Sequence, residues 1–181
     1  LTLDRRLVAT HPVTSTVTYT ATSHPRTVTH EPLSVLGRRY SLELPPNQNP
    51  RTLALATRSQ AGAPDTASYA RAVLDYFVQK GFEYTLTPPK LTGNAVDEFL
   101  FSTRRGFCGH YASAFATLMR AGGVPARVVT GYLGGEWNPV GRYFLVRQSD
   151  SHAWVEIWVG GRGWVRVDPT GERLPWHRSL L

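Results

Sequence analysis

Three side chains of this sequence could together carry out nucleophilic catalysis: Cys108, His152 and Asp168. In such a set the thiol attacks the substrate and the imidazole takes the thiol proton. The carboxylate holds the imidazole in the required tautomer and steadies the imidazolium. Cys108 is the single cysteine of the chain, which excludes an internal disulfide and a multi-cysteine zinc site. Cys108 and His152 are 44 residues apart in the sequence, and His152 and Asp168 are 16 apart. Only the folding of the chain can therefore bring the three side chains together.

The sequence around Cys108 predicts that the thiol lies in the first turn of a helix. Apolar residues recur downstream at helical spacing until Gly122 and Gly123 end the pattern; they are Tyr111, Ala112, Phe115, Ala116, Leu118 and Met119. Unpaired backbone N–H groups and the positive end of the helix dipole favour a thiolate there. From this stretch alone, a buried structural cysteine is an equally good interpretation.

His152 and Asp168 fall on two consecutive predicted strands, at residues 151–159 and 163–168. A three-residue connection, 160–162, keeps the valines of both strands on one face and the polar residues on the other. This register pairs Trp158 with Trp164 and Glu156 with Arg166. We therefore predict that His152 and Asp168 are diagonal neighbours on the polar face, within reach of a hydrogen bond.

The remaining elements indicate an α+β fold. Residues 1–48 read as a β-rich N-terminal segment with strands at Val13–Thr22 and Arg38–Leu44. Asn49 and Pro50 have the residue types of a helix cap and first position. Further helices are predicted at about 50–60, 66–80 and 94–101, further strands at 82–86, 124–133 and 142–148, and a loop at 134–139. Helices followed by consecutive strands predict an antiparallel sheet, against which the cysteine helix packs.

Four motifs in order along the chain resemble those of the transglutaminase-like superfamily, in particular the extracytoplasmic domains of bacterial membrane-anchored transglutaminases of the TgpA type. The motifs are residues 106–112, 122–132, 152–156 and 163–170, and 84–89 and 97–101 are similar too. The resemblance runs from about Asn49 to Thr170. Ser151 departs from the alanine expected before the histidine, which affects nothing essential.

The resemblance implies a papain-like core, with residues 49–181 as the catalytic domain. It implies that Cys108 is the nucleophile, His152 the base and Asp168 the orienting acid of a protein-glutamine gamma-glutamyltransferase. Cys108 would form a thioester with a glutamine carboxamide of a protein or peptide, and an amine such as lysine, or water, would accept the acyl group. It also implies a periplasmic or cell-surface domain of an integral membrane protein. No cofactor or metal is expected.

Two other functions stay open at this point. A cysteine peptidase or amidase could use the same fold, because water and amines compete for one acyl-enzyme. A non-catalytic binding module would leave the three residues vestigial. The net charge is +7, but the arginines are scattered, in pairs at most. No basic patch interleaves with aromatics, so nucleic acid is not an expected partner.

Some details of the site are also left open by the sequence. The Cys108 backbone N–H is the expected first donor to an oxyanion, and a second donor is needed. Asn94, Tyr84 and His110 are the candidates, with His110 better explained as structural. Glu136 and Trp137 could line the mouth of the site or belong to an exposed loop.

Overall fold

The computed structural model describes residues 11–22 and 32–171 of the chain. Its helices and strands follow one another as α1 Val35–Leu42, α2 Pro50–Ala61, α3 Thr66–Gln79, β1 Glu83–Tyr84, α4 Ala95–Glu98, π-helix η1 Phe99–Thr103, β2 Arg105–Gly106, α5 Cys108–Ala121, β3 Ala126–Tyr132, β4 Glu136–Asn138, β5 Tyr143–Leu145, 3₁₀-helix η2 Gln148–Asp150, β6 Ser151–Val159 and β7 Gly163–Val167. The predicted α+β class is confirmed.

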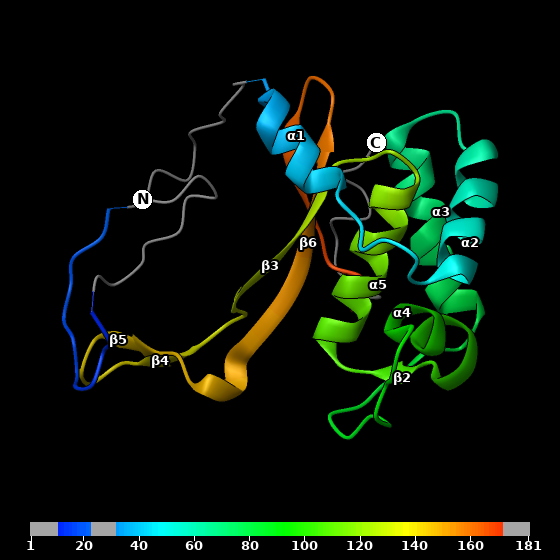
Figure 1. Ribbon diagram of the computed structural model, residues 1–181. Coiled ribbons are helices and arrows are strands. Elements are labelled where there is room, and N and C mark those ends of the chain that lie inside the picture. Colours follow the sequence, from blue (N-terminus) through cyan, green and yellow to red (C-terminus); the bar gives the residue numbers. More distant parts are fainter. Residues whose placement is uncertain (1–10, 23–31, 172–181) are drawn as a thin grey trace.

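The main sheet has three antiparallel strands in the order β3-β6-β7, and α5 packs against it (Figure 1). On its other side α5 contacts α2 and α3, so this helix is the centre of the molecule. Its inward-facing side chains are almost fully buried, as the apolar spacing predicts: Ala112, Phe115, Leu118 and Met119. The first residue of α5 is Cys108, which confirms that the thiol lies at a helix start.

The register of β6 and β7 agrees with the sequence prediction at each pair. Trp158 lies opposite Trp164, and Glu156 opposite Arg166. Val155 faces Val167 and both are fully buried, so the apolar faces of the two strands coincide. This alignment places His152, near the start of β6, beside the residue that follows β7, Asp168.

The segment 33–44 was predicted wrongly as part strand. Residues 35–42 form α1, because the Ser34 hydroxyl accepts a hydrogen bond from the Gly37 backbone N–H (3.0 Å) and caps the helix. The helix packs on α5 and β3, and the Arg120 guanidinium donates to the Glu43 carbonyl (2.9 Å) just after it. The short run of alternating residues at 38–44 did not reveal this cap.

Residues 13–22 were also predicted as a strand, and this was wrong. They are exposed and form no ladder with any strand in the described ranges. An alternating Val/Thr sequence becomes a strand only where a neighbouring strand satisfies its backbone groups. Residues 1–10 and 23–31 of the predicted N-terminal segment lie outside the described residues, and the domain boundary at residue 48 stays a prediction.

The predicted loop at 134–139 contains a strand. Residues 136–138 form β4, which pairs with β5 in a hairpin on the side of the molecule away from α2 and α3 (Figure 1). The predicted strand 142–148 is correspondingly shorter, because η2 follows it at 148–150. Trp137 packs on Phe144 with ring centroids 5.0 Å apart, and this cross-strand aromatic pair is what the loop prediction missed.

The start of α2 is stabilised by α4 from across the fold. The Asn49 side chain makes no cap bond to its own helix, contrary to the expectation from its residue type. Its amide oxygen instead accepts from the Val96 and Asp97 backbone N–H groups (3.0 and 3.1 Å). In return, Asp97 accepts from the Arg51 and Thr52 N–H groups (3.0 and 2.7 Å). The two helix starts therefore cap each other.

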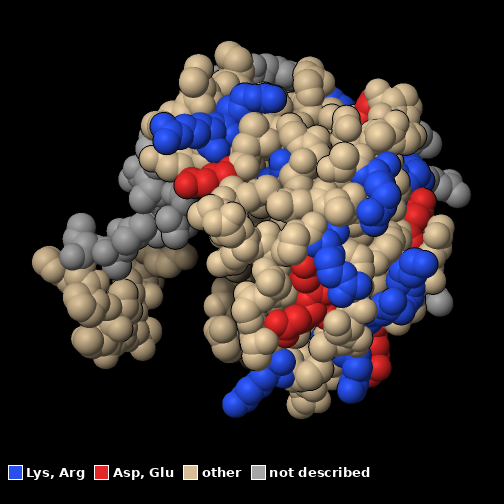
Figure 2. All heavy atoms as spheres, turned by 45° about the vertical axis from the view of Figure 1, so that its right-hand side comes forward, with Lys and Arg blue, Asp and Glu red and all other residues tan. Residues whose placement is uncertain are grey.

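Within the described residues, no helix has both the length and the apolar character to cross a membrane. Figure 2 shows acidic side chains interspersed among the Lys and Arg side chains on the face that it presents. This mixture agrees with the scattered distribution of arginines along the sequence.

Candidate active site

A buried histidine–carboxylate pair lies at the end of the β6–β7 hairpin. His152 Nε2 is 2.7 Å from Asp168 Oδ2, and their side chains are 11% and 4% exposed. The predicted hydrogen bond between these residues is confirmed. The strand register explains it, because both side chains extend from the same face of two paired strands.

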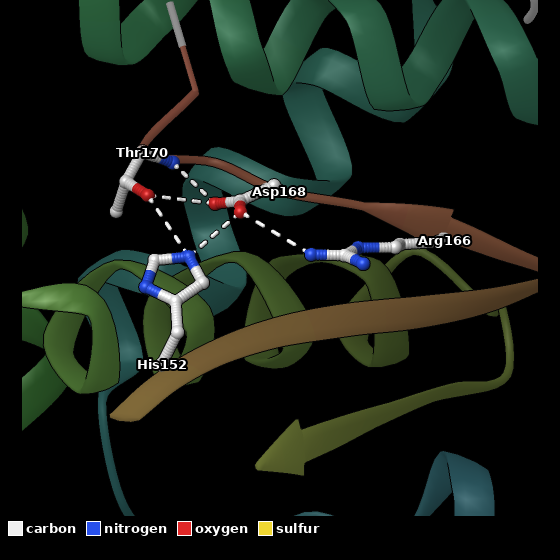
Figure 3. A network of polar contacts seen from close by, with 4 residues as sticks. All are labelled: His152, Arg166, Asp168 and Thr170. Carbon is white, nitrogen blue, oxygen red and sulfur yellow. Dashed lines mark hydrogen bonds and ion pairs between the residues drawn. The ribbon is translucent and has the colours of Figure 1, made fainter. Parts of the chain in front are cut away.

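Asp168 has further donors that hold its carboxylate in place (Figure 3). Oδ1 accepts from the Thr170 backbone N–H (3.1 Å) and from the Thr170 hydroxyl (2.7 Å). The Arg166 guanidinium lies 3.9 Å from Oδ2. An ionised carboxylate can only accept hydrogen bonds, so opposite it His152 donates from Nε2.

The other ring nitrogen of His152, Nδ1, points away from Asp168 (Figure 3). With the proton on Nε2, Nδ1 carries the lone pair and is the nitrogen able to accept a proton from another group. The Trp154 ring stacks beside the imidazole (centroids 6.5 Å apart), and the Arg166 guanidinium lies over Trp154 (4.2 Å). These ring contacts and the Asp168 hydrogen bond hold the orientation of the imidazole.

Arg166 and Glu156 lie opposite each other as predicted, but the ion pair of Glu156 is made elsewhere. Its carboxylate binds Arg127 of β3, with Oε2 2.6 Å from NH2 and 2.8 Å from Nε. Arg127 is directly opposite Glu156 in the β3–β6 ladder. Arg166 therefore contacts Trp154 and Asp168 and forms no ion pair with Glu156. The hairpin sequence alone could not reveal this arrangement.

Cys108 is half-buried at the first position of α5 and packs against the hydrophobic core. Just before it, the backbone at Gly106 packs closely on His110 and Phe99, because a Cβ added to Gly106 would lie 2.7 Å from the His110 Cβ. This crowding explains the glycine two residues before the thiol. The contact that we predicted between the Cys108 sulfur and a ring nitrogen of His152 stays a prediction.

His110 serves the start of the helix. Its Nδ1 accepts a hydrogen bond from the Phe107 backbone N–H (3.3 Å), and its ring packs edge-on against Phe107 (4.4 Å). Burial lowers the pKa of His110, which favours the neutral ring that this acceptor role needs. These contacts support the structural interpretation of His110.

A cavity of about 600 Å³ opens beside the pair; His152, Asp168 and Thr170 line it together with Tyr84 and Tyr111. Glu136 and Trp137 do not line this cavity, and Glu136 instead forms an ion pair with Arg147 (2.7 Å). No group of three or more His, Cys, Asp or Glu in residues 11–22 and 32–171 is arranged to hold a metal ion. The arrangement suits acid–base and nucleophilic chemistry at a carbonyl.

Comparison with known proteins gives a consistent result. The sequence model of the transglutaminase-like superfamily matches residues 53–169. A protein-glutamine gamma-glutamyltransferase of Pseudomonas aeruginosa is 44% identical over 172 residues, which cover 95% of this chain and 26% of that protein. The uncharacterised protein YebA of Bacillus subtilis is 35% identical over 139 residues, covering 73% of this chain and 19% of YebA. The chain thus spans about a quarter or less of these relatives.

Solved structures of related proteins are similar to this chain. The periplasmic domain of TgpA from Pseudomonas aeruginosa has a TM-score of 0.75 and 47% identity, covering 80% of this chain and 50% of that one. A putative cysteine protease from Cytophaga hutchinsonii has a TM-score of 0.55 and 25% identity, covering 77% and 43%. These similarities confirm the predicted fold, a papain-like α+β core. On the match to its sequence model and the identity to its members, the chain belongs to the transglutaminase-like superfamily.

Proposed function

We propose that this chain is the catalytic domain of a protein-glutamine gamma-glutamyltransferase with Cys108, His152 and Asp168 as its triad. The observation that carries the proposal is the buried hydrogen bond between His152 Nε2 and Asp168. It leaves Nδ1 as the base, in a chain that has its single cysteine at a helix start. The relative named protein-glutamine gamma-glutamyltransferase supplies the substrate class.

In the proposed reaction, His152 Nδ1 takes the proton of Cys108 and the sulfur attacks the carboxamide carbon of a glutamine side chain. The carbonyl electron pair moves to oxygen, and its return expels ammonia, which takes a proton from the His152 imidazolium. A thioester remains on Cys108. An amine such as a lysine side chain, or water, then attacks the thioester with His152 again as base.

We further propose that the domain works in the periplasm as part of a membrane-anchored protein. The support is the similarity to the periplasmic domain of TgpA, and the small share of the longer relatives that this chain covers. The expected partners are protein or peptide substrates that present a glutamine carboxamide, and amine donors.

Hydrolysis by a cysteine peptidase or amidase is the second candidate, because the structure of a putative cysteine protease matches the same fold. Mass spectrometry of a glutamine peptide incubated with the domain, with and without an added amine, separates the two. Transfer adds the amine and removes ammonia. Amidase activity converts glutamine to glutamate, and peptidase activity cleaves the peptide.

Cys108→Ala is the matched control, and we expect it to be inactive while its circular dichroism and unfolding curve stay close to wild type. Full activity in Cys108→Ala would exclude the proposed mechanism. A wild-type domain that binds the peptide and leaves it unchanged would instead support a non-catalytic binding module.

A further inference from the structure

Tyr84 is held beside the start of the cysteine helix by a short parallel ladder. β1 pairs with β2 so that Tyr84 lies opposite Gly106, two residues before Cys108. The Thr85 N–H donates to the Gly106 carbonyl (2.8 Å), and the Glu83 N–H donates to the Arg104 carbonyl (2.8 Å). Both flanks of Tyr84 are therefore tied to the segment that carries the thiol.

The ring of Tyr84 is fixed as well as its backbone. It stacks on Tyr111, one turn into α5, with centroids 6.2 Å apart and planes 27° from parallel. Tyr111 in turn packs in a cluster with Phe77, Phe82 and Phe99. Tyr84 is nevertheless half exposed, and it lines the same cavity as His152 and Asp168. A substrate in this cavity can therefore meet its hydroxyl.

The electrostatics of Tyr84 agree with its position beside the segment that carries Cys108. Burial raises the pKa of Tyr84, and the coulombic interaction with Cys108 raises it further. The Cys108 backbone N–H opposes these effects on the Tyr84 pKa by hydrogen bonding. These effects agree with the ladder and the ring stacking, which place Tyr84 beside the start of α5. The Tyr84 hydroxyl is protonated at neutral pH and available as a donor.

The other two candidates for a second oxyanion donor are anchored by other contacts and do not line this cavity. Asn94 Oδ1 accepts from the Asn49 backbone N–H (2.6 Å), within the α2–α4 junction. His110 Nδ1 accepts from the Phe107 N–H at the other side of the helix start. Of the three candidates, Tyr84 alone lines the cavity as it is built from the described residues.

We propose that Tyr84 is a catalytic residue whose hydroxyl donates the second hydrogen bond to the oxyanion, beside the backbone N–H of Cys108. This inference rests on the proposed function and adds the group that stabilises its tetrahedral intermediates. As the Cys108 sulfur bonds to the carbonyl carbon, the C=O electron pair moves to oxygen. That oxygen then accepts one hydrogen bond from the Cys108 N–H and one from the Tyr84 O–H. Return of the electron pair expels the leaving group.

The test compares two reactions of the same thiol. Alkylation by iodoacetamide displaces iodide at a saturated carbon and forms no oxyanion. Acylation by p-nitrophenyl acetate passes through a tetrahedral oxyanion and releases p-nitrophenolate, whatever the natural substrate is. Both rates are measured in wild type, in Tyr84→Phe, and in Tyr76→Phe as the control. Tyr76 is also a partly buried tyrosine with a raised pKa, but it is not among the residues of the cavity.

We expect Tyr84→Phe to slow acylation by about 100- to 1000-fold, the range for loss of one oxyanion donor. Alkylation should stay close to the wild-type rate, which also reports that the site is folded. Tyr76→Phe should match wild type in both reactions. Since Phe keeps the ring that stacks on Tyr111, a purely structural role of Tyr84 would leave the ratio of the two rates unchanged.

Each other outcome overturns the inference in a distinct way. Equal acylation in Tyr84→Phe and wild type removes Tyr84 from the mechanism and leaves the proposed function intact. An equal fall in both rates assigns the hydroxyl to thiolate formation instead. A rise in both rates identifies it as a group that blocks the thiol. A wild-type Cys108 that is alkylated but never acylated defeats the proposed acyl transfer itself.

Discussion

Two buried carboxylates in this protein are built alike and positioned for different purposes. Asp168 and Asp97 are 4% and 6% exposed, and each accepts from one threonine hydroxyl and at least one backbone N–H. Three donors to Asp97 belong to the start of α2, at residues 51 and 52. Asp168 has in addition the His152 imidazole.

The difference lies in whether the partners can change their protonation. Backbone N–H groups and a threonine hydroxyl keep their protons at any ordinary pH, so Asp97 can only stabilise the helix start. An imidazole gains and loses a proton near neutral pH, so Asp168 can control which nitrogen acts as the base. Burial of an acid alone is therefore a poor sign of catalysis, and the partner is the informative feature.

Among substitutions at the two carboxylates and their threonines, the largest effect on acylation is expected for Asp168→Asn. The Thr170 backbone N–H must keep an acceptor, so the new amide oxygen will face Thr170 and the amide NH₂ will face His152. Nε2 then becomes the acceptor and the proton moves to Nδ1, which can no longer take the thiol proton. We expect acylation by p-nitrophenyl acetate to fall by about 10²- to 10⁴-fold.

The loss should be smaller than that of Cys108→Ala or His152→Ala, because Asp168 acts through the ring. Thermal unfolding should show a modest change, since Asn keeps the shape of the side chain. An Asp168→Asn variant with wild-type acylation would mean that the tautomer of His152 is set by another group.

The same isosteric change at Asp97 should have the opposite outcome. Both oxygens of Asp97 accept from N–H groups that cannot reorient, so an Asn amide must direct its NH₂ at one of them. We expect Asp97→Asn to lower the free energy of unfolding by about 2–4 kcal/mol in urea titrations. Acylation of Cys108 per folded molecule should be unchanged. A variant that is stable but inactive would show that the two carboxylates are coupled.

These two sites also differ in how far the sequence could predict them. The His152–Asp168 bond was predicted because strand alternation and a three-residue turn determine a register, and a register determines neighbours. The junction around Asp97 joins residues about 45 apart through a helix start, and no periodic pattern marks such a contact. The sequence therefore suggested Asn49 as the cap of α2, whereas the side chain that caps it is Asp97.

The errors elsewhere have the same physical origin. Alternation at 13–22 and 38–44 predicts strands, but alternation does not supply the neighbouring strand that a ladder needs. A cap at Ser34 makes the second stretch a helix. Longer signals performed better: the repeat along α5 predicted both its buried face and the position of Cys108 at its start.

The smallest and sharpest test uses the two threonines. Thr170 and Thr52 each donate a hydroxyl to their carboxylate, at 2.7 and 2.6 Å, and valine removes each hydroxyl at similar size. Thr170→Val keeps the hydrogen bond from the residue 170 backbone N–H to Asp168. The carboxylate therefore stays in place but is held less firmly against His152. We expect acylation to slow by about 3- to 10-fold, with little change in stability.

Thr52→Val removes a hydrogen bond that serves only the fold. It should lower the free energy of unfolding in urea by about 1 kcal/mol without slowing acylation. Measuring the acylation rate and the free energy of unfolding in both variants tests this contrast. If both variants lose stability and neither loses activity, the hydroxyl of Thr170 is a structural donor like that of Thr52, and the contrast between the two carboxylates reduces to the imidazole alone.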